Sequence, residues 1–126
     1  MDIYKILAVG LGGFLGSVAR YITVKSLDEK LNAVFPYGTL TVNIIGSFLL
    51  GLIYSIALRK AGVTENWRLF LGVGFCGGFT TFSAFALENF MLIQQKFIGI
   101  SLVYTSISLV AGLFALVAGM WLGRLI

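Results

Sequence analysis

Charged side chains are missing from three long stretches of this chain, and mostly apolar residues fill these stretches. The three stretches cover residues 31–58, 69–87 and 97–123. A fourth apolar run covers 6–19 and resumes at 21–24, beyond Arg20. A helix needs about 18 to 20 apolar residues to cross a hydrocarbon core of about 30 Å. The pattern therefore predicts an all-α membrane protein with four transmembrane helices, over about 4–25, 38–58, 68–95 and 97–123.

Composition agrees with this interpretation. The 126 residues are 59% hydrophobic, have a mean hydropathy of +1.00 and include nine Lys or Arg and five Asp or Glu. The connections between the expected helices are short, so residues 1–126 are expected to form a single integral membrane domain in the cell membrane. We expect the first helix to be retained, because no small-residue cleavage site precedes a mature domain.

Several classes of protein are excluded. One cysteine and no histidine rule out an internal disulfide framework and imidazole-based chemistry. No nucleophile–base pair and no paired carboxylates are recognisable, so an enzyme is not expected. The net charge of +4 comes from basic residues scattered at helix ends, where they anchor a chain at lipid headgroups. We therefore expect contact with membrane lipid and no binding of nucleic acid.

The basic residues are divided almost evenly between the two sides of the expected helices. The side of both termini carries Lys5, Arg59, Lys60, Arg68 and Arg124, and the other side carries Arg20, Lys25, Lys30 and Lys96. A chain with one fixed orientation usually has a clear excess of Lys and Arg in its cytoplasmic loops. Either a partner subunit fixes the orientation, or the chain inserts both ways and forms antiparallel pairs. A dimer is expected in both cases.

The third expected helix contains an unusual segment at 74–85, with the sequence GFCGGFTTFSAF. Gly77 and Gly78 favour a break, and backbone freed at membrane depth must be buried in protein or line a site. A straight helix over 69–95 would also be about 40 Å long, which exceeds the hydrocarbon core. Carbonyls freed near Gly77 and Thr80 suit a small cation such as Na⁺.

The residues after this break suit an anion. Thr80, Thr81 and Ser83 begin the second half-helix, whose N-terminus favours negative charge. Phe82 and Phe85 are three residues apart and so share one face. An aromatic pair usually only packs against its neighbours. Turned into a narrow path, however, the positive ring edges would attract a small anion without a full charge.

The second expected helix carries a polar stripe on an otherwise apolar surface. Thr39, Asn43 and Ser47 recur every four residues and therefore share a face. Asn43 is the most informative, because one backbone contact cannot satisfy both donors and the acceptor of its amide. It serves either as a bond between helices or as a ligand group, and its position beside the third helix favours the ligand group.

Other candidates lie on the remaining helices. Glu88, one turn after the aromatic pair, must be paired, wet or near the membrane surface. Tyr104 and Ser108 are four residues apart, so their hydroxyls share a face that can meet the asparagine of the second helix across a path. Ser101 and Thr105 receive no role, because hydroxyls on transmembrane helices mostly bond their own backbone.

The first expected helix has glycines at a spacing suited to packing. Gly12 and Gly16 place small residues on one face and let another backbone approach closely. Arg20 lies near the end of this helix, where its side chain can reach the headgroups. Alternatively, Arg20 raises the positive potential of a vestibule that attracts anions.

Three segments resemble the Fluc (CrcB-type) fluoride channels: GGFLGSVARY at 12–21, YGTLTVNIIG at 37–46 and GFCGGFTTFSAF at 74–85. The resemblance covers the whole chain in length and helix number, and the second and third segments are highly specific. It implies a passive fluoride channel that works as an antiparallel dimer, with two pores and a central structural Na⁺. The partner would be a second copy of the chain or a paralogous subunit.

The resemblance also implies roles for individual residues. Carbonyls of Gly77 and Thr80 would bind Na⁺, Asn43 would donate to fluoride, and Phe82 and Phe85 would flank the pore. Gly112 stands where some members have a polar residue. The implied polar track includes Thr39, Ser83, Tyr104, Ser108 and Glu88, with Arg20 at a vestibule.

Two rival classes fit less well. A small four-helix multidrug exporter has a similar length, but it needs a membrane-embedded carboxylate to exchange protons for drug. Glu88 is the only candidate here, since the first helix has no Asp or Glu after Asp2. A membrane scaffold would explain the glycines but not the break with its Thr and Phe cluster.

Overall fold

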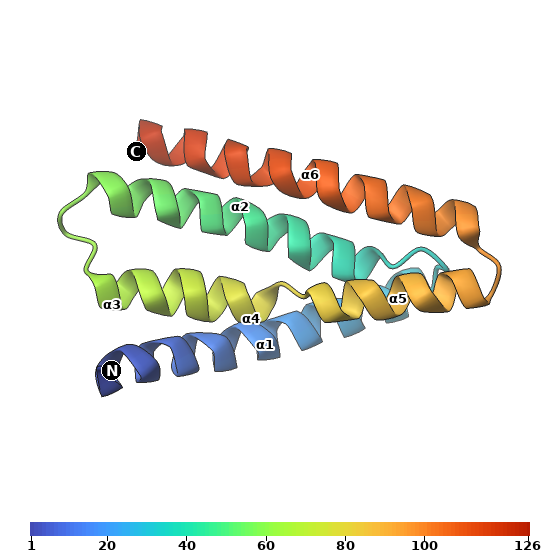
Figure 1. Ribbon diagram of the computed structural model, residues 1–126, viewed down its shortest axis with the longest axis horizontal. Helices are drawn as coiled ribbons and strands as arrows, with labels where there is room; N and C mark the ends of the chain where they lie inside the picture. The colour runs from blue at the N-terminus through green and yellow to red at the C-terminus, as the bar shows by residue number, and fades with distance from the viewer.

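The computed structural model describes all residues, 1–126, and the chain is helical throughout apart from short connections (Figure 1). Three long helices are α1 (Ile3–Leu31), α2 (Tyr37–Arg59) and α6 (Ile98–Leu125). The third span, residues 65–94, consists of α3 (Glu65–Arg68), the π-helix η1 (Leu69–Cys76), α4 (Gly77–Phe79) and α5 (Phe82–Gln94). All four spans are long and apolar enough to cross a membrane. The expected all-α fold with four apolar helices is confirmed.

Helix α1 continues to Leu31, beyond its expected end near residue 25. Asp2 caps its start by accepting a hydrogen bond from the N–H of Tyr4 at 2.9 Å. Asn32 ends it in the left-handed conformation, with a φ of 45°. Residues 26–31 are polar but include good helix formers. The apolar pattern marked the end of the hydrophobic stretch, whereas the helix continues past it.

The third span is interrupted as expected, but at Thr80 and Thr81 rather than at the paired glycines. Both threonines are extended, with ψ angles of 156° and 122°. Gly77 and Gly78 keep helical backbone. A Cβ on Gly78 would lie 2.6 Å from the carbonyl oxygen of Gly13 in α1. Gly78 therefore serves close packing, and the break falls where threonine side chains can bond the backbone locally.

Two pairs of segments approach so closely that only glycine fits between them. A Cβ on Gly12 or Gly16 of α1 would lie 2.1 Å from a backbone oxygen of η1. A Cβ on Gly51 of α2 would lie at the same distance from a backbone oxygen of α6, and a Cβ on Gly119 of α6 from a backbone oxygen of α2. Small residues at helix interfaces in membranes allow this approach. The predicted packing role of Gly12 and Gly16 is confirmed.

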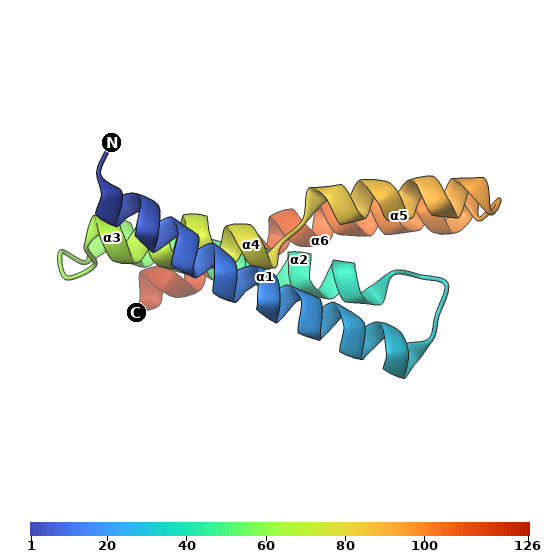
Figure 2. The same ribbon diagram turned by 90° about the horizontal axis from the view of Figure 1, so that it is seen from below.

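The two ends of the molecule differ in shape. Both termini and the connection between α2 and α3 lie at one end (Figure 1). At the other end α5 lies on α6, while α1 and α2 diverge from them (Figure 2). Only 17 of the 126 residues are buried, and most large apolar side chains are exposed. Such an apolar exterior is suited to lipid or to another subunit.

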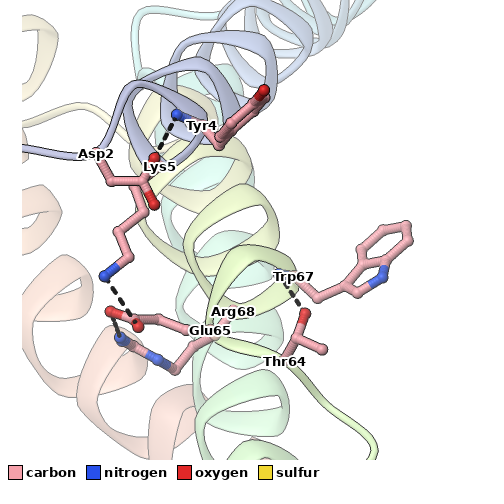
Figure 3. A network of polar contacts seen from close by, with 7 residues as sticks. All are labelled: Asp2, Tyr4, Lys5, Thr64, Glu65, Trp67 and Arg68. Atoms are coloured by element: carbon pink, nitrogen blue, oxygen red, sulfur yellow. Dashed lines mark hydrogen bonds and ion pairs between the residues drawn. The ribbon is translucent and has the colours of Figure 1, made fainter.

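Polar contacts hold α1 against α3 at the end near the N-terminus (Figure 3). Lys5 lies 3.2 Å from the carboxylate of Glu65, and Arg68 lies 3.9 Å from the same carboxylate. Thr64 caps α3 by accepting from the N–H of Trp67 at 3.3 Å. These side chains are about half exposed, so each ion pair contributes only about 0–1 kcal/mol.

Candidate functional site

A cavity of about 520 Å³ lies beside the break in the third span. Helix α2, the third span and α6 all contribute to its lining. No Lys, Arg, Asp or Glu lines the cavity, and most of its surface comes from small or apolar residues, including the buried Cys76. Six of the expected site residues line it: Asn43, Phe82, Phe85 and Ser108 from the expected fluoride path, and Gly77 and Thr80 from the expected sodium site.

Asn43 of α2 is bonded to the break by both ends of its amide. Its Nδ2 donates to the carbonyl of Thr81 at 3.1 Å, and its Oδ1 accepts from the N–H of Thr81 at 2.7 Å. The amide thus satisfies backbone groups that the extended Thr81 leaves without helical partners. One of the two N–H groups of Asn43 makes no bond within the chain, so this residue joins two helices and still offers a donor.

Two carbonyls at the break lose the partners that a continuous helix would provide. The N–H of Thr81, four residues after Gly77, bonds Asn43 instead. The N–H of Ala84, four residues after Thr80, bonds Oγ1 of Thr81 at 3.1 Å. Gly77 and Thr80 both line the cavity. Their carbonyl oxygens are therefore suited to a small hard cation, which takes oxygen ligands.

The aromatic pair stands at the start of α5. The ring centroids of Phe82 and Phe85 are 5.7 Å apart, with an angle of 42° between the planes. Phe85 also lies 5.1 Å from the ring of Tyr104 in α6. Phe82 is 79% exposed on this chain although it lines the cavity. The cavity is therefore open on the side of Phe82.

A second polar group lies beyond Phe85, outside the cavity lining. Glu88 accepts from the hydroxyl of Thr39 at 2.8 Å and from that of Tyr104 at 2.9 Å. Thr39 and Tyr104 are almost completely buried. A carboxylate removed from water needs such donors, because an unpaired buried charge is very costly. Glu88 is thus paired with hydroxyls, one of the three environments expected for it.

The hydroxyls of Tyr104 and Ser108 lie at different groups, although the two residues share a helix face. Ser108 lines the cavity with Asn43, whereas the hydroxyl of Tyr104 is bonded to Glu88. The carboxylate is the stronger acceptor and holds the tyrosine on its own side. The buried Oγ of Ser108 has no hydrogen-bond partner within the chain. This hydroxyl is therefore an unpartnered polar group beside the cavity.

Arg20 and Ser83 lie at the edges of this region. Nε of Arg20 donates to the carbonyl of Gly78 at 3.0 Å. The carbonyl end of a helix carries partial negative charge, which attracts a cation, so this end of the guanidinium is bonded at the break. Ser83 is exposed, with its Oγ 3.3 Å from Oγ1 of Thr81.

One polar residue was missed in the sequence. Asn89 of α5 accepts from Ser101 at 2.7 Å and from Thr105 at 3.2 Å, and it donates to the carbonyl of Phe85 at 3.2 Å. The expectation that Ser101 and Thr105 bond only their own backbone is wrong. An asparagine within an apolar span was the available signal, because it is the same signal that singled out Asn43.

Known proteins resemble this chain over most of its length. A family profile described as "CrcB-like protein, Camphor Resistance (CrcB)" matches residues 7–120. A relative from Chlorobium chlorochromatii (strain CaD3), named "Fluoride-specific ion channel FluC", is 51% identical over 90 residues, which are 71% of this chain and 69% of the relative. A relative of the same name from Caulobacter vibrioides (strain NA1000 / CB15N) is 45% identical over 80% of each chain. Another, from Geobacter sulfurreducens, is 46% identical over 77% of this chain and 79% of the relative.

Four apolar spans with a polar break beside a cavity define a small multi-pass membrane channel rather than an enzyme. The profile match reaches from the first span into the fourth, and the match to the second relative covers 80% of the chain. The chain belongs to the CrcB-like family of ion channels, to which the name FluC is also given.

Proposed function

We propose that this protein is a channel that passes fluoride passively across the membrane and excludes chloride. The observation that carries the proposal is the set of uncharged groups around one cavity. Ser108 offers an unpartnered buried hydroxyl, Asn43 a free N–H, and Phe82 and Phe85 their rings. The relatives named above are called fluoride-specific channels. Both arguments favour the same ion.

The chemistry of the cavity is suited to a small anion that must lose its water. Dehydrating an ion costs tens of kcal/mol, by Born solvation at low dielectric, unless other groups replace the water. The hydroxyl of Ser108 and the N–H of Asn43 are such donors, and positive ring edges can surround the rest of the ion. No fixed cation lines the cavity, which matters because conduction requires binding weak enough to release the ion.

We assign the second polar group to the same path. Thr39 and Tyr104 each hold a hydroxyl on Glu88, and Phe85 lies between this group and the cavity, in contact with Tyr104. A fluoride ion that passes Phe85 meets these two hydroxyls, and one of them can turn to the ion while the other still donates to the carboxylate. In this proposal Ser83 lies on the path near its cavity end, and Arg20 contributes positive potential at a vestibule.

A second subunit completes the path in this proposal. Phe82 lines the cavity and yet is 79% exposed, so another surface is needed to enclose the ion beside it. The near-even division of Lys and Arg favours an antiparallel arrangement. Two copies related in this way contain two equivalent cavities and therefore two pores. The partner is a second copy of this chain or a paralogous subunit.

A central Na⁺ also fits the residues at the break. The carbonyls of Gly77 and Thr80 are the groups that would hold it, because both lack the N–H partner that a continuous helix provides. Bound there, the cation would neutralise the partial negative charge of these oxygens. Within the chain, the two hydrogen bonds between Asn43 and Thr81 hold the backbone at the break in its extended conformation.

Ion efflux from liposomes tests the proposed function. Vesicles that contain the purified protein should release fluoride into a fluoride-selective electrode cell without a proton gradient, while they retain chloride. Equal chloride efflux would contradict selectivity, and a requirement for a proton gradient would indicate a carrier. Protein-free vesicles are the control.

The aromatic pair is tested in the same assay. Phe82→Ile and Phe85→Ile keep an apolar side chain but remove the ring edges, so both should lower fluoride flux at least tenfold without changing the elution volume of the protein. Phe90→Ile, at an exposed ring of the same helix, should conduct as the original chain does. Unchanged flux in both test variants would remove the rings from the mechanism.

A further inference from the structure

Helix α5, which carries the aromatic pair and Glu88, contains no glycine and packs mainly on α6. The short turn at 95–97 keeps α5 next to α6 but does not fix its rotation about its own axis. Contacts between apolar side chains add little orientation in a membrane, because lipid tails are equally apolar. Polar contacts can therefore set this rotation.

Asn89 makes the polar contacts that can do so. Its Oδ1 accepts from Oγ of Ser101 at 2.7 Å and from Oγ1 of Thr105 at 3.2 Å. These hydroxyls are one helical turn apart on α6, so the Asn89 oxygen is held between them and uses both of its lone pairs. Nδ2 of Asn89 donates to the carbonyl of Phe85 and holds the side chain along α5.

We propose that Asn89 is a positioning residue of the ion path: it sets the rotation of α5 on α6 and thereby directs Phe85 and Glu88 at Tyr104. Phe85 and Glu88 precede Asn89 by four residues and by one residue, and both contact Tyr104. Neighbouring residues of a helix differ by about 100° in direction. A rotation of α5 by one residue would therefore carry Glu88 away from its tyrosine. This inference rests on the proposed fluoride conduction.

Fluoride efflux from liposomes is the first test. Asn89→Leu, which is similar in size but cannot accept a hydrogen bond, should lower flux at least fivefold while the protein elutes as the original chain does. The matched control is Gln94→Leu, because Gln94 is an exposed amide on the same helix with no side-chain hydrogen bond in the structure. This control should conduct normally.

Two further measurements separate positioning from a general loss of structure. The double variant N89T/T105N exchanges the two side chains, so that the amide lies on α6 and the hydroxyl on α5. Because the pair can still form a hydrogen bond, flux should return to within about twofold of the original chain. If Asn89 acts through the contacts with Tyr104, then adding Tyr104→Phe to Asn89→Leu should cause almost no further loss. Independent, multiplicative losses in the double variant would overturn the inference.

The outcomes distinguish the inference from the proposed function. If the original chain does not release fluoride, both fail together. If it conducts and Asn89→Leu conducts equally well, only the role of Asn89 is overturned. Should Asn89→Leu not fold, Ser101→Ala and Thr105→Val each remove one of the two donors. Each should lower flux by a smaller factor than their combination, and unchanged flux in the combination would contradict the inference.

Discussion

The packing of α1 against η1 differs in kind from the packing of α5 against α6. The first contact is between backbones, with Gly12 and Gly16 leaving no room for a Cβ. The second has no glycine on α5 and depends on hydrogen bonds that hydroxyls of α6 donate to Asn89 and Glu88. The first region cannot shift without a steric clash, whereas the second can shift when a few polar bonds are exchanged.

This difference distinguishes the backbone contacts that support the fold, here called the scaffold, from the polar contacts at the proposed ion path. The groups assigned to the ion path lie where polar bonds hold the helices, and a hydroxyl bonded to a carboxylate can also turn to an anion. In membrane proteins such bonds average about 0.6 kcal/mol, with a maximum of about 1.7 kcal/mol. Contacts this weak can be exchanged during ion passage, while the backbone contacts of α1 and α2 keep the break in place.

The largest expected effect tests the backbone contact. Gly16→Ala places a Cβ 2.1 Å from the carbonyl oxygen of Phe75, so it should destabilise the fold by about 3 kcal/mol or more, the upper part of the range for overpacking. The recovery of protein in one elution peak after heating in detergent measures this. Gly10→Ala, whose Cβ would meet nothing within 4 Å, is the control. Equal recovery of the two would show that α1 can move away.

The next largest effect concerns the amide of Asn43, which joins α2 to the break in the third span. Asn43→Leu leaves the N–H and carbonyl of Thr81 without their partner, and each unsatisfied buried group costs about 1–3 kcal/mol. We expect a lower midpoint temperature and at least a tenfold loss of fluoride flux. Asn66→Leu, at an exposed amide, should match the original chain. Normal flux in Asn43→Leu would contradict the role given to this amide.

A smaller effect is expected within the polar region. Tyr104→Phe removes one of the two hydroxyls on Glu88 and should cost at most about 1.7 kcal/mol. Fluoride flux should fall by a factor of about two to five, with little change in the midpoint temperature. Loss of stability as large as that of Gly16→Ala would show that the two regions are not held differently.

The smallest effect concerns the exposed ion pair at the end of α1. Lys5→Ala removes the contact with Glu65 at 3.2 Å, in which both side chains are about half exposed. Surface pairs contribute about 0–1 kcal/mol and are weakened by salt. The midpoint temperature should therefore change by a few degrees at most at low salt and not at all at high salt. A large change would place this pair among the scaffold contacts.

Much of the fold could be predicted from the sequence, because gaps in the charge pattern mark apolar spans directly. The existence of a break could also be predicted, but its position could not. Gly77 and Gly78 resembled helix breakers, yet Gly78 is needed for the approach of α1 at Gly13. Whether a glycine serves packing or a turn depends on its spatial neighbours, and these are not visible in one sequence.

The polar partners were the least predictable part of the site. Asn43 was recognised as important, but its partner could not be predicted. The bonds to Thr81 depend on which residues of the third span lie next to Asn43 when α2 packs against it, and one sequence does not show this. Tyr104 and Ser108 share a helix face, yet a strong acceptor on α5 separates their roles. Asn89 was overlooked because its partners, Ser101 and Thr105, are residues that usually bond their own backbone.

The π-helix η1 affects how the third span responds to bilayer thickness. A π-helix bonds i to i+5 and so contains more residues per turn than an α-helix, which makes this span shorter than its residue number suggests. Rewinding η1 into α geometry would lengthen the span on one side of the break. Hydrophobic mismatch costs only fractions of a kcal/mol per Å, and the close backbone contact of η1 with Gly12 and Gly16 opposes such rewinding, so the break should keep its depth in bilayers of different thickness.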